Sequence, residues 1–162
     1  MSRQPKFLTD QNNYISSAFR ARIRQLLEEN GCKNNEEFAD LAGVSAPVII
    51  KAVNFGIIPT LKPLLKIADS LQISFNYLLA KTEDRAFYPA LEPSDFHTRL
   101  RELRAEHHSD WSTVLFNLPF PRTYIYEWLK EGTYPCVDYL YALAKAFEVS
   151  PDYLLGRTDD RN

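Results

Sequence analysis

Residues 111–132, WSTVLFNLPFPRTYIYEWLKEG, have the pattern of a short helix, a tight turn and a second short helix. Apolar residues recur at helical spacing in the first helix, prolines end it, and a second apolar stripe follows at i, i+3 and i+4. These groups are Val114, Leu115 and Leu118, then Pro119 and Pro121, then Ile125, Trp128 and Leu129. The pattern predicts a second helix that is held by one face and exposes the other.

The predicted outer face of this second helix has the chemistry of a helix that contacts DNA. Arg122, Thr123, Tyr124 and Tyr126 lie near its N-terminus. In a major groove, Arg pairs with guanine, and hydroxyl groups bond to bases or phosphates. These four residues are therefore candidate base contacts. A solvated helix with two exposed tyrosines explains the same pattern, so this stretch alone leaves both interpretations open.

The residues around this stretch form a longer motif. Phe96, Leu100 and Leu103 form the apolar stripe of a preceding helix, and residues 149–160, VSPDYLLGRTDD, follow at the end. With this frame, the second half of the chain resembles the phage-repressor-like helix-turn-helix domains of the Xre family. The resemblance implies an all-α fold, double-stranded DNA as partner and a role in transcription regulation. It also implies dimers, because paired half-sites about one helical turn apart need two recognition helices.

The chain also contains an internal repeat. Residues of the first half match residues of the second half at an offset of 77, and of 76 after one residue is lost. The matched pairs include Phe19 with Phe96, Ile49 with Ile125, Gly56 with Gly132, Pro59 with Pro135, and Tyr77 with Tyr153. A match over about sixty positions is the signature of a repeated structural unit. We therefore predict two tandem five-helix repressor-like domains at 17–80 and 94–162, an N-terminal arm at 1–16 and an ordered, aromatic-rich connector at 81–93.

Helix starts are expected at residues that cap helices or fit their first turn. They are Ser17, Asn34, Ser45, Thr60 and Ser74 in the first copy, and Ser94, Ser109 or Asp110, Pro121, Cys136 and Ser150 in the second. No segment alternates apolar and polar residues as a strand does, so the predicted class is all-α.

Composition excludes several classes of protein. With 162 residues, 45% hydrophobic and 25% charged, the chain has the composition of a soluble globular protein. No uncharged apolar run reaches the roughly 18 residues of a membrane span. The first residues, MSRQPKFLTDQNNY, lack the apolar segment of a secretory signal, which favours a cytoplasmic location. Cys32 and Cys136 lack paired-ligand spacing, so we expect two reduced thiols without a disulfide or a zinc site.

The charge balance gives limited support to nucleic-acid binding. Residues 1–85 carry 11 Lys and Arg against 9 Asp and Glu, whereas residues 86–162 carry 8 against 12. Neither half has the basic excess of a typical nucleic-acid binder, so DNA binding must depend on local clusters. The candidate phosphate contacts are Lys130, Arg99, Lys51, Lys62 and Lys33.

The two copies differ in the helix that would contact DNA. The counterpart of residues 122–131 is the segment 46–55, APVIIKAVNF, which is apolar where the resemblance implies polar residues. Val48, Ile50 and Phe55, together with Tyr77, are therefore expected to form a protein contact, such as that of a homodimer. In the second copy, the turn contains two prolines, which cannot adopt a left-handed conformation. Trp111, Ser112 and Thr113 also replace the glutamine or serine that usually contacts a phosphate in this family.

The sequence contains none of the common motifs of enzymes. There is no glycine-rich phosphate loop, nucleophile elbow or metal signature. His107 and His108 are adjacent on a helix and point about 100° apart, so they do not share a metal. We expect no catalytic residue, cofactor, metal or small-molecule substrate. Two hypotheses remain: a sequence-specific DNA-binding regulator, or a degenerate helix-turn-helix protein that acts as a dimerisation or interaction module.

Overall fold

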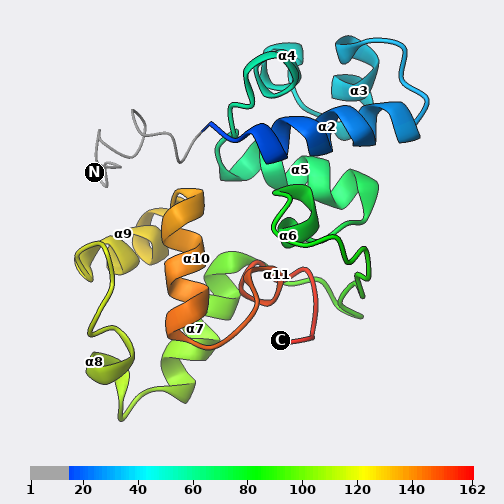
Figure 1. Ribbon diagram of the computed structural model, residues 1–162. Coiled ribbons are helices and arrows are strands. Elements are labelled where there is room, and N and C mark those ends of the chain that lie inside the picture. Colours follow the sequence, from blue (N-terminus) through cyan, green and yellow to red (C-terminus); the bar gives the residue numbers. More distant parts are fainter. Residues whose placement is uncertain (1–14) are drawn as a thin grey trace. The chain divides into compact units, whose positions relative to one another are not determined.

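The computed structural model describes residues 15–162, which form ten α-helices and no β-strand (Figure 1). The predicted all-α class is confirmed. Most of the predicted N-terminal arm, residues 1–14, lies outside the described residues. Within the described residues the chain divides into two compact units, 15–87 and 88–162. Each unit contains five of the helices.

The first unit begins its helices at polar capping residues. Its helices are α2 (Ser17–Glu29), α3 (Asn35–Ala42), α4 (Ala46–Phe55), α5 (Leu61–Leu71) and α6 (Phe75–Leu78). The predicted caps Asn34 and Ser74 are confirmed, because each side chain accepts a hydrogen bond from a backbone N–H of the first turn. The cap of α2 is Ser16, one residue before the predicted Ser17.

The core of the first unit holds α4 at the surface. α4 packs against α2 and α3, and α3 also packs against α5. Fully buried apolar side chains fill the space between these helices, among them Phe19, Phe38, Ile49 and Leu64. Gly43 makes the turn between α3 and α4 at φ +72, a left-handed conformation that favours glycine. One face of α4 is therefore packed inside the unit and the other is available to a partner.

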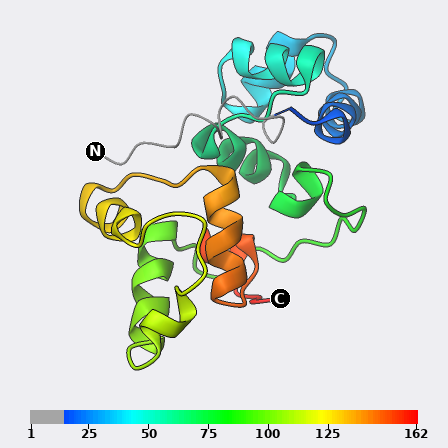
Figure 2. The ribbon, with the colours of Figure 1, turned by 60° about the vertical axis from the view of Figure 1, so that its left-hand side comes forward.

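The second unit has the same order of helices with different lengths. They are α7 (Phe96–Glu106), α8 (Trp111–Val114), α9 (Thr123–Glu131), α10 (Val137–Ala146) and α11 (Pro151–Leu154). α11 packs against both α7 and α10 (Figure 2). Phe96, Leu100, Ile125, Trp128 and Leu140 are buried in its core.

Two predicted helix starts of the second unit are wrong. α7 is capped by Asp95 in place of Ser94, since the Asp95 carboxylate accepts a hydrogen bond from the Thr98 N–H at 2.8 Å. This bond holds the pKa of Asp95 below its usual range. α9 begins at Thr123, two residues after the predicted Pro121. Asp and Ser cap helices about equally well, so adjacent candidates cannot be separated from sequence alone.

The predicted connector, residues 81–93, is divided between the two units, and each part of it contacts its own unit. In the first unit, Arg85 forms an ion pair with Glu29 at 3.0 Å. In the second unit, the Ala90 N–H donates to the Arg157 carbonyl at 2.9 Å, and Thr158 Oγ1 donates to the Tyr88 carbonyl at 2.7 Å.

Candidate nucleic-acid interface

α4 is the candidate recognition helix of the first unit. Ile49 and Ala52 are buried on its inner face. Pro47, Lys51 and Asn54 are exposed. Because their spacing is i, i+4 and i+7, these three residues share one face of the helix. That face presents a cation and an amide to a partner.

The apolar stripe predicted on α4 is only partly at the surface. Val48 and Ile50 are half-buried in their own unit, whereas Phe55 is 63% exposed at the C-terminal end of the helix. Adjacent helical positions point about 100° apart, so a small change in the rotation of a helix exchanges the covered and exposed residues. Lys51 and Asn54 are exposed polar residues of α4, and Val48 and Ile50 are more covered than the sequence pattern implied.

Two arginines of α2 hold the end of α4. Arg20 Nε and Arg24 Nε both donate to the Val53 carbonyl, at 2.9 and 3.1 Å. This carbonyl lies in the last turn of α4, where backbone oxygens lack partners within the helix. The two positive charges also lie at the end of the helix dipole that carries partial negative charge. The contacts fix the position of α4 against α2.

Four of the five predicted phosphate contacts are exposed residues. Lys33 precedes α3, Lys51 lies on α4, Lys62 lies in the first turn of α5, and Lys130 lies in the last turn of α9. Exposed lysines of this kind supply the sequence-independent part of DNA affinity when they meet phosphates. Three of the four belong to the first unit.

α9 is the candidate recognition helix of the second unit. Arg122 is its N-cap residue, and both Arg122 and Thr123 are exposed. The Arg122 guanidinium donates to Ser112 Oγ of α8 at 3.3 Å, which orients it between the two helices. The inner face of α9 is held by Ile125 and Trp128, which are fully buried. The predicted base contacts Arg122 and Thr123 thus lie exposed at the start of α9.

The two predicted tyrosine contacts are engaged in contacts within the second unit. The Tyr124 ring is half-buried and stacks on Phe120, with ring centroids 6.1 Å apart. Tyr126 is 41% exposed, and its hydroxyl accepts a hydrogen bond from Trp111 Nε1 at 3.2 Å. The Arg104 guanidinium lies 5.1 Å from the Tyr126 ring centroid. Both tyrosines therefore help to hold α9 in its unit.

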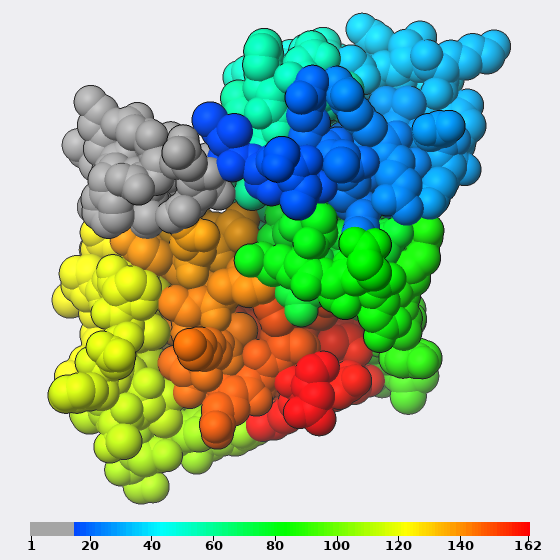
Figure 3. Space-filling view, in the orientation of Figure 1, coloured from blue at the N-terminus to red at the C-terminus, as the bar shows by residue number. Residues whose placement is uncertain are grey.

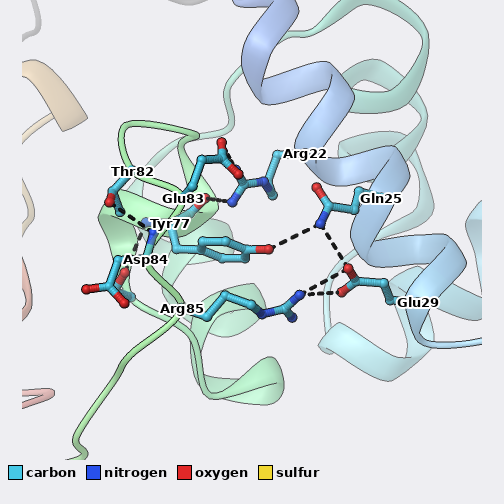
Figure 4. Close-up of polar contacts among 9 residues, drawn as sticks. Arg22, Gln25, Glu29, Tyr77, Thr82, Glu83, Asp84 and Arg85 are labelled. Atoms are coloured by element: carbon cyan, nitrogen blue, oxygen red, sulfur yellow. Dashed lines mark hydrogen bonds and ion pairs between the residues drawn. The ribbon is translucent and has the colours of Figure 1, made fainter.

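Tyr77 does not belong to an exposed protein interface, which corrects the expectation from sequence. It is 1% exposed, and its ring lies between two guanidinium groups, Arg22 at 3.7 Å and Arg85 at 4.8 Å (Figure 4). Arg22 also donates to the Tyr77 carbonyl at 2.9 Å and to Glu83 at 2.7 Å. Arg85 pairs with Glu29. Cation–π contacts of this kind stabilise a buried ring, so Tyr77 is a structural residue.

Arg99 does not face a phosphate, which is a second correction. It is 7% exposed, and its guanidinium lies 4.1 Å from the Tyr153 ring centroid. It donates to the Thr158 carbonyl at 3.3 Å and to the Asp159 carboxylate at 3.2 Å. A guanidinium that is buried and bonded within its own unit is not available to DNA.

These two clusters correspond position by position. Arg161 lies 4.8 Å from the Tyr153 ring centroid and bonds to Glu106 at 2.5 Å. That hydrogen bond holds the pKa of Glu106 below its usual range. The corresponding residues are Arg22 and Arg99, Glu29 and Glu106, Tyr77 and Tyr153, Glu83 and Asp159, and Arg85 and Arg161. All five pairs have the offset of 76 or 77 residues that the sequence repeat has.

A further contact occurs in both units at the same offset. Arg24 donates to the Val53 carbonyl in α4, and Arg101 donates to the Leu129 carbonyl in α9 at 3.1 Å. In each unit the first helix is therefore tied to the end of the candidate recognition helix by an arginine.

Two further features of the part of the chain that the structure describes concern metal ions and membranes. Residues 15–162 contain no group of three or more His, Cys, Asp and Glu side chains that could hold a metal ion. Among the same residues, no helix is both long and apolar enough to cross a membrane.

Comparison with known proteins identifies one segment. Residues 23–78, from the first turns of α2 to the end of α6, match the family model described as helix-turn-helix. No curated protein and no solved structure matches the chain. The match lies in the first unit, whereas the resemblance noted from sequence was based on the second. The first unit thus contains a segment similar to the helix-turn-helix family, a structure typical of DNA-binding regulators.

Proposed function

We propose that this protein is a sequence-specific DNA-binding regulator of the phage-repressor type, with a helix-turn-helix in each of its two units. The observation that carries the proposal is α4: it follows α3 across a tight turn inside the segment that matches the helix-turn-helix family, and it exposes Lys51 and Asn54. In a major groove, Asn pairs with adenine, and an exposed Lys beside it can contact a backbone phosphate.

The repeated contacts support a second helix-turn-helix in residues 88–162. A buried arginine–tyrosine cluster forms only when several residues from distant positions of the chain are all present. The same set of residues occurs in both units at an offset of 76 or 77 positions. α9 is ended by Gly132 at φ +70, as α4 is ended by Gly56 at φ +69. α4 and α9 therefore correspond in their place within their units as well as in the sequence repeat.

The proposal assigns roles to the exposed residues of both units. Arg122 and Thr123 contact bases. Tyr126 and Tyr124 add contacts to bases through their hydroxyl groups. Lys33, Lys51, Lys62 and Lys130 contact phosphates. Arg99 has no part in binding, because its guanidinium is buried in its own unit.

A second candidate function is an interaction module that dimerises or binds another protein without DNA. It is favoured by the exposed apolar groups around the α3–α4 pair, Leu41 and Phe55, which are 46% and 63% exposed. The excess of carboxylates in residues 88–162, 12 against 8 basic residues, also favours it. In this case Phe55, with the partly covered Val48 and Ile50, forms the contact of a homodimer or of a complex.

Salt dependence of DNA binding separates the two functions. We expect the full chain to bind a mixed-sequence duplex at low salt, with log affinity falling against log salt at a slope of about −3.6, since each of four phosphate contacts contributes about −0.9. Lys51→Ala and Lys130→Ala should each make the slope shallower by about 0.9. The matched control is Lys145→Ala, which removes an exposed charge from α10, whose residues are orange in the space-filling view of Figure 3. A chain that binds no duplex at low salt and forms dimers disrupted by Phe55→Ser would support the interaction module instead.

A further inference from the structure

The two candidate recognition helices present different chemistry from the same place in their units. Each carries a fully buried isoleucine at the matched position, Ile49 in α4 and Ile125 in α9, and each ends at a left-handed glycine. Their exposed residues differ: Pro47, Lys51, Asn54 and Phe55 on α4, and the N-cap Arg122 with Thr123, Tyr126, Lys130 and Glu131 on α9.

These differences imply different base preferences. On α4, Asn54 suits adenine, and it lies in the last turn of the helix. On α9, Arg122 suits guanine and Thr123 contacts a base or a thymine methyl group, and both lie at its start. Two helices with different side chains at different positions do not select the same half-site.

The charges of the two helices differ as well. α4 contains no acidic residue, and Arg20 and Arg24 lie at its C-terminal end. α9 contains Glu127 and the exposed Glu131. Carboxylates near a groove repel phosphates and suppress binding to wrong sequences. The α4 half therefore contributes more of the affinity, and the α9 half contributes mainly discrimination.

We propose that a single chain binds a non-palindromic DNA site made of two dissimilar parts, one contacted by α4 and the other by α9. This inference rests on the proposed function. A regulator with one recognition helix per chain needs two identical chains on a palindrome, because operator symmetry mirrors the symmetry of the protein. A chain with two unlike recognition helices already supplies both contacts and has no two-fold symmetry between them.

Selection of binding sites from a random duplex library tests the proposal. The full-length protein should enrich a motif of two unlike parts, and the mass of the complex should correspond to one chain per duplex. Asn54→Ala should relax the preference in one part, and Arg122→Ala in the other, with affinity for the parent motif reduced roughly 5- to 150-fold in each case. Arg122→Lys should lose the same base preference while keeping the salt slope, since lysine keeps the charge and lacks the planar fork of arginine. Lys145→Ala should enrich the parent motif.

The outcomes separate the inference from the function on which it rests. A palindromic motif bound by two chains would overturn the inference and leave a DNA-binding regulator. A motif that Asn54→Ala or Arg122→Ala leaves unchanged in both parts would overturn it too, provided that circular dichroism shows the variant folded. Absence of binding to every duplex at low salt would remove the proposed function itself.

Discussion

Replacing Arg99 by methionine should destabilise the second unit without changing how DNA binding depends on salt. Methionine keeps the apolar stem of the side chain but cannot donate to the Thr158 carbonyl, which loses its hydrogen bond in a buried position. Leaving such a group unsatisfied costs about 1 to 3 kcal/mol, and the lost contact with the Tyr153 ring adds about 0.5 to 2 kcal/mol. The ion pair with the exposed Asp159 adds little. The expected loss of unfolding free energy is about 3 kcal/mol.

Tryptophan fluorescence during urea unfolding measures this loss, because both tryptophans of the chain, Trp111 and Trp128, lie in the second unit. Binding to a mixed-sequence duplex is then measured against salt at a temperature where the variant is folded. Lys145→Met is the control, since it removes an exposed positive charge from the same unit. A variant with parental stability and a salt slope shallower by about 0.9 would show that Arg99 contacts a phosphate and is not held inside its own unit.

Two further substitutions test the backbone and the electrostatics of the units. Gly56→Ala should lower the melting temperature, followed by circular dichroism, more than Gly132→Ala does. Both glycines have positive φ, but only at Gly56 would the new Cβ lie 2.5 Å from a backbone atom, the Ser16 carbonyl oxygen. Equal losses would contradict the close approach at Gly56. Glu106 has a lowered pKa because Arg161 donates to it, so this carboxylate stabilises the fold above its unfolded pKa and the contribution is lost as pH falls through the folded pKa. Urea titrations from about pH 7 to about pH 3 should therefore show a smaller acid-side loss in Glu106→Gln, and an unchanged acid profile would argue against the pair.

Local signals account for what could be predicted about the elements. A cap acts on a backbone N–H three residues away, and a glycine sets the turn at its own position, so Asn34, Ser74 and Gly43 are visible in a short stretch of sequence. The absence of alternating stretches likewise indicated an all-helical chain. Where two capping residues are adjacent, as at Ser94 and Asp95, the local signal is ambiguous and the structure decides.

The candidate site was predicted unevenly. Arg122 and Thr123 are exposed at the start of α9. On α4, the exposed pair is Lys51 and Asn54, whereas Val48 and Ile50 are partly covered. Helical spacing identifies which residues share a face, but the rotation of that face against neighbouring helices depends on the packing of the whole unit.

The sequence by itself determined an all-helical chain with a repeat of fixed offset and a helix-turn-helix segment, because periodicity, caps and turn residues act over a few positions. Only the tertiary structure showed that Tyr77 and Arg99 are structural. Arg22 bonds to the carbonyl of Tyr77, 55 positions away, and Arg99 bonds to Asp159, 60 positions away. No local sequence pattern indicates which distant group will bond to a buried guanidinium. Burial of an arginine is stable only when such partners are present, so the folded chain decides which basic residues remain exposed.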